Sequence, residues 1–181
     1  TQFTHDGDGN RVKKVENGQT TVYAGNHYEA VTTAFQETFE GDTGRWSTGG
    51  LWHITAQKAN SPVKSAWYGQ EGSGNYATGG RTTGVLQMTL TGTLRSDSVL
   101  RFQYWREVES YSGAYDQTYV QLSTDGGATW SGYLFYRDSR NASERAWVSS
   151  GEISLGAYAG AQNVLLRFVF DSVDGLYNNY G

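Results

Sequence analysis

The sequence predicts an all-β protein: an antiparallel two-sheet β-sandwich of jelly-roll type, preceded by a β-hairpin. The first observation is composition, since 181 residues include 24 Gly, 13 Tyr, 7 Phe and 6 Trp but one Pro and one Met, which favours turns and pleated surfaces. The second is that apolar and polar side chains alternate with period two in several windows, whereas no window has the helical period. The third is that Gly- and Ser-rich breaks at residues 69–80, 110–113 and 125–127 separate these windows.

The clearest alternation is Leu86-Gln87-Met88-Thr89-Leu90, in which the apolar side chains fall on one face of a strand and the polar ones on the other. Residues 100–104, 119–122 and 164–171 follow the same rule. Strands with one wet face are typical of antiparallel sheets. Two such sheets bury their apolar faces by packing against each other, and we expect this sandwich over residues 35–181.

Residues 1–33 differ in texture and predict a separate hairpin segment. Asp6-Gly7-Asp8-Gly9-Asn10 and Asn17-Gly18 are turn signals, and residues 11–16 and 19–23 flank the second of them as the strands of a hairpin do. We place the boundary between the two segments at residues 30–34.

This segment resembles a YD repeat of the RHS family. The resemblance is carried by residues 3–11, Phe-Thr-His-Asp-Gly-Asp-Gly-Asn-Arg, followed by Asn17-Gly18, Val22-Tyr23 and residues 25–29, Gly-Asn-His-Tyr-Glu. Phe3 and His5 stand where the family usually has Tyr. The resemblance implies a large secreted or surface protein whose repeats wind into a β-shell.

Residues 123–130 fit the Asp-box pattern S-x-D-x-G-x-T-W at every fixed position, which are Ser123, Asp125, Gly127, Thr129 and Trp130. We expect a structural turn in which the Asp125 carboxylate accepts hydrogen bonds from backbone amides, glycines supply positive φ, and Trp130 packs beneath the turn. The motif is known from sialidase-like propellers, so a glycosidase-related fragment is a less favoured alternative. Against it, the chain has one such box and no repeated blades.

Most of residues 37–181 resembles the MAM-like jelly-roll modules attached to secreted bacterial peptidases such as immune inhibitor A. The matching stretches are Phe39-Glu40, residues 50–53, residues 66–69, Tyr115-Asp116 and the Asp-box hairpin. The resemblance implies a structural calcium ion, for which Glu40 and Asp171 are the candidate ligands by position. Solvated acids at loop ends are the alternative.

These modules usually continue with a closing strand that the sequence ending Asn178-Asn179-Tyr180-Gly181 does not contain. We therefore expect an open sheet edge. Such an edge invites β-strand addition from other copies of the chain or from neighbouring parts of a larger polypeptide.

Several function classes are disfavoured. A charged fraction of 18% and a net charge of −4 argue against nucleic-acid binding, which needs clustered cations. No apolar stretch is long enough for a membrane helix, and the absence of cysteine excludes disulfides and thiolate metal sites. His5, His27 and His53 have neither metal-ligand spacing nor a nucleophile elbow beside them, so we expect no enzyme.

The sequence therefore predicts a non-catalytic, extracellular structural or adhesive module of a secreted or surface bacterial protein. The alternative is a carbohydrate-binding module, because aromatic side chains near Gly-rich loops can stack on sugar rings. The candidate glycan-binding residues are Trp52, Trp67 and Tyr68.

Overall fold

A computed structural model of the chain describes residues 1–8, 11–16, 19–23, 29–33 and 35–181. The Gly-Asn and Asn-Gly turn signals, His27 and most of the last stretch of the YD resemblance lie outside the described residues. The chain divides into two compact units, Thr1–Thr38 and Phe39–Gly181. Their border lies further along the chain than the expected boundary at residues 30–34, because a strand runs through Thr33.

The first unit is an antiparallel meander in the order β1-β2-β3-β4. Its strands are β1 (Gln2–His5), β2 (Arg11–Glu16), β3 (Gln19–Tyr23) and β4 (Glu29–Thr33). The expected hairpin of residues 11–23 is the β2–β3 pair, in which Glu16 lies opposite Gln19. The other two strands extend this ladder on both sides, which a hairpin needs because two strands alone are marginally stable in water.

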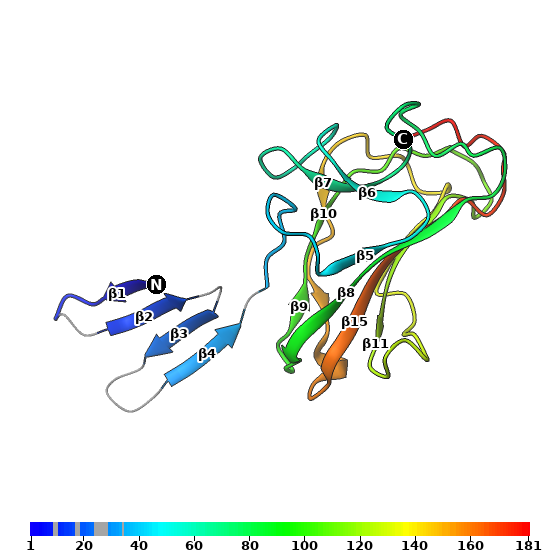
Figure 1. Cartoon of the computed structure of the whole chain (residues 1–181). Helices are drawn as coiled ribbons and strands as arrows, with labels where there is room; N and C mark the ends of the chain where they lie inside the picture. Colours follow the sequence, from blue (N-terminus) through cyan, green and yellow to red (C-terminus); the bar gives the residue numbers. More distant parts are fainter. Residues whose placement is uncertain (9–10, 17–18, 24–28, 34) are drawn as a thin grey trace. The chain divides into compact units, whose positions relative to one another are not determined.

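The main sheet of the second unit has five strands in the order β12-β11-β15-β8-β5, and every neighbouring pair is antiparallel. Figure 1 shows β8 and β15 side by side as its two longest members. The strands are β5 (Trp46–Thr48), β8 (Thr83–Thr93), β11 (Gln117–Ser123), β12 (Phe135–Arg137) and β15 (Gln162–Asp171).

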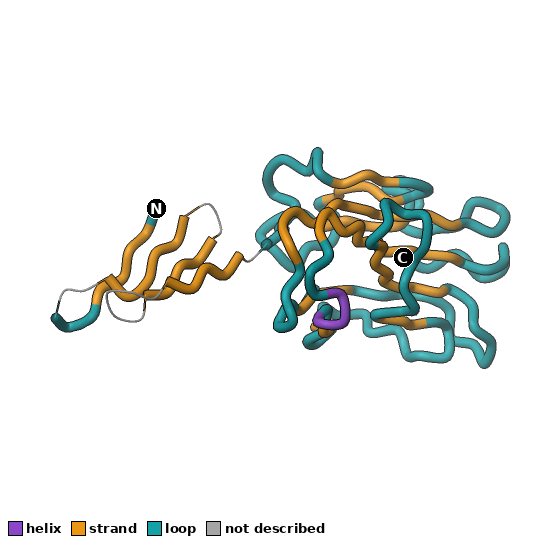
Figure 2. Tube along the Cα trace, turned by 90° about the horizontal axis from the view of Figure 1, so that it is seen from below, coloured by secondary structure: helices purple, strands orange, loops and turns teal. Residues whose placement is uncertain are grey.

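The opposite layer consists of three short antiparallel pairs. These are β6 (Trp52–Thr55) with β7 (Ser65–Tyr68), β9 (Val99–Leu100) with β14 (Ile153–Ser154), and β10 (Gln103–Tyr104) with β13 (Val148–Ser149). One 3-10 turn, η1 (Gly156–Tyr158), is the helical element of the described residues and is purple in Figure 2. The predicted all-β, antiparallel sandwich is therefore confirmed.

The core lies between these layers. Met88, Val120 and Leu166 of the main sheet are at most 4% exposed and pack in one cluster with Leu100 and Phe102 of the opposite layer. The period-two alternation correctly identified these inward faces. It predicted one strand over residues 100–104, which the structure splits into β9 and β10.

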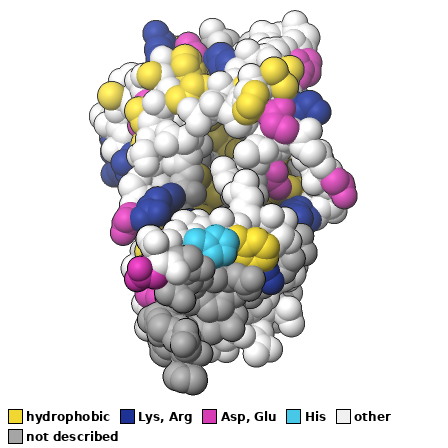
Figure 3. All heavy atoms as spheres, turned by 90° about the vertical axis from the view of Figure 1, so that its left-hand side faces the viewer, with side chains coloured by type: hydrophobic (Ala, Val, Ile, Leu, Met, Phe, Trp, Pro, Cys, Tyr) yellow, Lys and Arg dark blue, Asp and Glu magenta, His cyan; other side chains and the backbone are white. Residues whose placement is uncertain are grey.

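The split occurs at Phe102, whose backbone amide donates to the Ser150 side-chain oxygen at 3.0 Å, while its carbonyl accepts from the Ser150 amide at 2.9 Å. In the described part of the chain, no helix is long and apolar enough to span a membrane. On the face shown in Figure 3, basic and acidic side chains are interspersed.

Candidate functional site

The main sheet has a second face, pointing away from the core, on which strand register assembles two rows of side chains. One row runs from Val85 through Val169 and Tyr119 to Tyr136. The neighbouring row runs from Ser47 through Gln87 and Arg167 to Gln121. Successive side chains of a strand alternate between faces, so both rows lie on the face opposite Met88, Val120 and Leu166. Val169, within the first row, is nevertheless buried, at 3% exposure. We name these eight residues, with Trp130 and Tyr133, the outer face.

Three tyrosine rings form an aromatic row on the outer face. The ring of Tyr133 lies 4.8 Å from that of Tyr119 and 4.9 Å from that of Tyr136, centroid to centroid, and is stacked on the latter at 24°. Tyr133 remains 56% exposed. Tyr119 and Tyr136 are half-buried. The row is therefore a preformed aromatic surface with Tyr133 as its most exposed ring, and such surfaces are typical of ligand-binding platforms.

A hydrogen-bonding row adjoins the tyrosines. The Arg167 guanidinium carbon lies 3.7 Å from the centroid of the Trp130 ring. Arg167 Nη2 and Nε donate to Gln121 Oε1 at 2.7 and 3.2 Å. The Gln121 amide nitrogen donates in turn to the Ser131 carbonyl at 2.7 Å. Polar groups of fixed orientation thus stand beside aromatic rings.

The 123–130 turn carries Trp130 to this place. Asp125 Oδ1 accepts from the Thr129 amide at 2.9 Å and from the Ser123 hydroxyl at 2.7 Å, while the Thr129 hydroxyl donates to Oδ2 at 2.5 Å. These donors hold the pKa of Asp125 well below its usual range. The Gly127 amide donates to the Ser123 oxygen at 2.8 Å, and its φ of 95° suits glycine.

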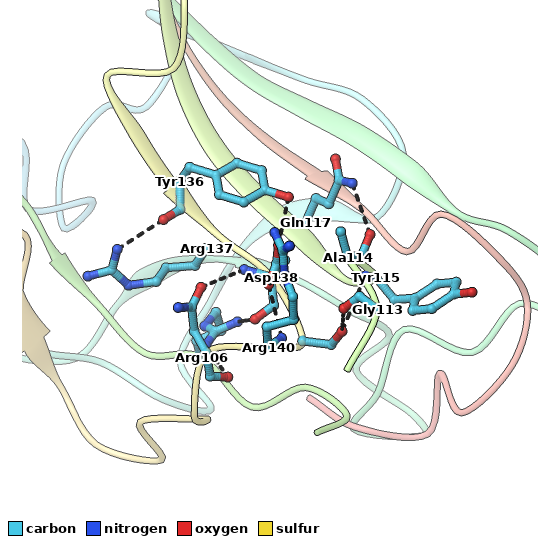
Figure 4. A network of polar contacts seen from close by, with 11 residues as sticks. Arg106, Gly113, Ala114, Tyr115, Gln117, Tyr136, Arg137, Asp138 and Arg140 are labelled. Carbon is cyan, nitrogen blue, oxygen red and sulfur yellow. Dashed lines mark hydrogen bonds and ion pairs between the residues drawn. The ribbon is translucent and has the colours of Figure 1, made fainter. Parts of the chain in front are cut away.

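A polar network at the end of β12 orients Tyr136 (Figure 4). The Tyr136 hydroxyl donates at 2.9 Å to Asp138, a side chain that is 1% exposed. The Asp138 carboxylate also accepts from the Arg140 amide at 2.9 Å and from its guanidinium group, which lowers the pKa of Asp138. Burial, together with the Asp138 hydrogen bond, raises the pKa of Tyr136 to about 12. The ring is therefore held in place as a neutral phenol.

Arg106 anchors the same loop. This 4%-exposed side chain donates to the carbonyls of Asp138 at 2.8 Å, Asn141 at 3.0 Å and Ala142 at 2.8 Å, and pairs with the Glu144 carboxylate at 3.1 Å. The loop after β12 is thus fixed by a fully engaged guanidinium group.

The sequence-predicted glycan residues occupy β6 and β7, elsewhere in the unit. Tyr68 is 6% exposed, stacks on Phe170 at 4.5 Å and shares a 2.6 Å hydrogen bond with Thr82. Trp52 lies opposite Tyr68 in the ladder and packs against the same core cluster. Trp67 is half-buried beside the His53 ring at 5.3 Å. Trp52 and Tyr68 therefore serve packing, because the alternation of this hairpin points them inward.

The calcium candidates are held by protein donors. Glu40 Oε1 accepts from the Val63 and Lys64 amides at 2.9 and 2.8 Å. Both oxygens of Asp171 are bonded by Arg81, at 2.9 and 2.5 Å. A cation bound to Asp171 would have to displace this guanidinium group, and the described residues contain no group of three or more His, Asp or Glu placed to hold a metal ion. The structural calcium stays a prediction.

A separate buried acid lies at the start of β11. Asp116 is 0% exposed, and its Oδ2 accepts from the Tyr76 hydroxyl at 2.7 Å and the Glu109 amide at 3.3 Å. Its Oδ1 has no hydrogen-bond partner among the described residues. Burial raises the pKa of Asp116 to about 7, and Glu109 and Asp174 add to this rise. Asp116 therefore keeps its proton to a higher pH in the folded chain than in the unfolded chain.

Sequence reasoning missed the outer face. The alternation in residues 119–122 and 164–171 already placed Tyr119 and Arg167 on the polar face of their strands, which was the available signal. Their convergence with Tyr133, Tyr136 and Trp130 depends on the register between strands, which alternation within one strand does not contain.

No protein-family model and no curated protein matches the chain. Among solved structures, it is similar to a xylan-binding domain of carbohydrate-binding module family 22, with 13% identity, a TM-score of 0.45 and coverage of 77% of this chain and 86% of that one. It is also similar to the C-terminal family 22 carbohydrate-binding module of Clostridium thermocellum Xyn10B, with 12% identity, a TM-score of 0.43 and coverage of 80% and 94%. Similarity at this level identifies no ligand for this chain.

Proposed function

We propose that the chain is a non-catalytic glycan-binding module of an extracellular protein and that its ligand lies along the outer face. The observation that carries this proposal is the row formed by the exposed Tyr133 and the half-buried Tyr119 and Tyr136, beside the Arg167–Gln121 hydrogen-bond pair. Aromatic faces pack on the C–H surfaces of sugar rings, and amide or guanidinium groups bond sugar hydroxyls. The site needs no reacting groups to do this.

The structural or adhesive role through sheet-edge strand addition has less support. The main sheet ends on β5 and β12, and each of these strands is three residues long. Short edge strands limit the ladder that an added strand forms. The YD-type and MAM-like origins of the two units stay predictions, and either agrees with a secreted glycan-binding protein.

The test is binding of the purified chain to a panel of plant and bacterial polysaccharides, followed by calorimetric titration with oligosaccharides of each polysaccharide bound. We expect Tyr133→Ala to weaken binding by about tenfold, corresponding to about 1.4 kcal/mol, because it removes the central ring of the row. Tyr111→Ala is the matched control, since Tyr111 is equally exposed, at 56%, and also has a tyrosine neighbour, Tyr115.

Tyr111→Ala should bind as the unaltered chain does, and both variants should keep its melting temperature. Wild-type binding that Tyr133→Ala leaves intact would place the ligand elsewhere. Failure of every polysaccharide to bind would remove the proposal.

A further inference from the structure

Arg167 is a partly buried cation whose protein contacts are all neutral. It stacks on Trp130 and bonds Gln121 Oε1, and in the described part of the chain no carboxylate forms an ion pair with it. Six other arginines each lie within 3.5 Å of a carboxylate: Arg81, Arg95, Arg101, Arg106, Arg140 and Arg145. Arg167 therefore keeps an uncompensated charge on the outer face.

Burial makes this charge costly. Removal of a cation from water is unfavourable unless an anion or several hydrogen bonds replace the solvent, and burial indeed lowers the pKa of Arg167. A cation–π contact of about 0.5–2 kcal/mol offsets part of this cost. An anion arriving at the outer face would offset more.

The free hydrogen-bond donors of Arg167 have a definite geometry. A guanidinium group has five N–H donors. Gln121 Oε1 occupies one on Nε and one on Nη2. The remaining donors comprise both N–H groups of Nη1 and one of Nη2, which together form the end-on fork that binds a planar carboxylate through two parallel hydrogen bonds.

The nearby charges do not compete for such an anion. Asp171 is the next side chain after Val169 on the outer face of β15. Its carboxylate forms an ion pair with Arg81, which neutralises its charge. The chain as a whole has a net charge of −4, so its overall field does not attract anions. A preference for an anionic ligand therefore has to come from local pairing with Arg167.

We propose that the glycan bound on the outer face is acidic, and that a uronic acid carboxylate pairs with the free edge of Arg167 while an adjoining sugar ring lies on the tyrosine row. This inference rests on the proposed function and specifies its ligand class. It also assigns Arg167 the role of specificity-determining residue.

The experiment compares one polysaccharide in two forms: polygalacturonate, or a glucuronic-acid-bearing xylan, and the same polymer after its carboxyl groups have been reduced to alcohols. We expect the unaltered chain to bind the uronate form at least tenfold more tightly. In Arg167→Gln this preference should disappear, and Arg167→Lys should keep only part of it because lysine offers no fork. Arg101→Gln, which removes an exposed arginine paired with Glu152, is the control and should keep the full preference.

The outcomes separate the two proposals. If the reduced polymer binds equally well and Tyr133→Ala still weakens binding about tenfold, the outer face binds glycans but the acidic class is wrong. If sulfated polysaccharides bind as tightly as uronates through Arg167, carboxylate specificity is wrong. If neither form of any polymer binds, the proposed function itself fails. The melting temperature of Arg167→Gln should not fall, since the variant removes a partly buried charge.

Discussion

The Arg167 guanidinium carbon lies 3.7 Å from the centre of the Trp130 ring, which joins the central strand of the main sheet to the 123–130 turn. Arg167 belongs to β15, and Trp130 is the last residue of the turn that begins where β11 ends. A residue identified from a turn motif and a residue identified from strand alternation thus meet on one surface. The turn is therefore part of the candidate site as well as of the fold.

We predict that Trp130→Leu lowers the affinity for acidic glycans by a larger free energy than it lowers the stability of the fold. The substitution removes the ring under Arg167, a contact of about 0.5–2 kcal/mol, and frees the guanidinium group from its fixed position. Unfolding in urea should show a loss of about 1 kcal/mol, whereas titration should show loss of the uronate preference. Trp130→Phe keeps an aromatic face, so its uronate preference should lie between those of the unaltered chain and Trp130→Leu. Equal binding by Trp130→Leu and the unaltered chain would separate the turn from the site.

We predict that Asp125 makes the fold sensitive to acid. Its pKa is lowered in the folded chain by the Thr129 and Ser123 donors, so the unfolded state binds more protons as the pH falls. Its stabilising contribution is then present above the ordinary aspartate pKa, near 4, and is lost progressively below it. Melting temperatures measured from pH 6 to pH 2 should decline less steeply for Asp125→Asn, which starts lower at pH 6. Parallel curves for the two proteins would contradict this.

Sequence alone predicted the antiparallel sandwich because its main strands have one buried face, and side chains such as Met88 and Leu166 repeat with period two. It did not predict that Trp52 and Tyr68 pack inward. Aromatic side chains fit a core and a binding platform equally well, and only the partner layer decides between these places.

The outer face could not be predicted from the sequence for a related reason. Tyr133 lies outside the strands, between β11 and β12, and its stacking on Tyr136 follows from the path of the chain between them. Likewise, Arg167 looks like any solvent-facing charge until the ladder places Gln121 opposite it. Side-chain pairing across strands is a property of register, which depends on the whole sheet.

We predict that Arg106→Met destabilises the fold by about 3 kcal/mol. The substitution removes the cation that pairs with Glu144 and one donor from each of three carbonyls, although Glu144 keeps the Tyr104 hydroxyl and the Asp138 carbonyl keeps the Asn141 amide. Breaking a buried pair from one side costs about 3–5 kcal/mol. Arg145→Met is the control, because Arg145 is 60% exposed and pairs with Glu107 at 3.5 Å. Such an exposed pair contributes about 0–1 kcal/mol. Urea unfolding of both variants checks the difference, and equal losses would contradict the role given to Arg106.

We also expect Arg106→Met to weaken glycan binding, since the loop that it anchors holds Asp138 and, through it, the Tyr136 ring. Tyr136→Phe separates the two effects because it removes the Asp138 hydrogen bond but leaves Arg106 and the loop contacts in place. If this bond positions the ring, Tyr136→Phe should weaken binding as Arg106→Met does while losing less stability. Unchanged binding by Tyr136→Phe would show that the ring is positioned without Asp138.

We predict that Asp116 makes the fold less stable as the pH rises from about 4 to about 7. The pKa of Asp116 in the folded chain, about 7, lies above the ordinary aspartate pKa of 3.8, so between these values the folded state keeps a proton that the unfolded state has lost. Because the folded state binds more protons in this window, stability falls with rising pH, and the loss of stability is complete above the folded pKa.

Asp116→Asn cannot ionise, and its amide oxygen can still accept from the Tyr76 hydroxyl and the Glu109 amide. Denaturant unfolding at pH 5 and pH 8 should therefore show a smaller drop for Asp116→Asn than for the unaltered chain, whereas Tyr76→Phe, which removes a donor to the carboxylate, should enlarge the drop. A drop of the same size in all three proteins would mean that Asp116 titrates in the folded chain as it does in water.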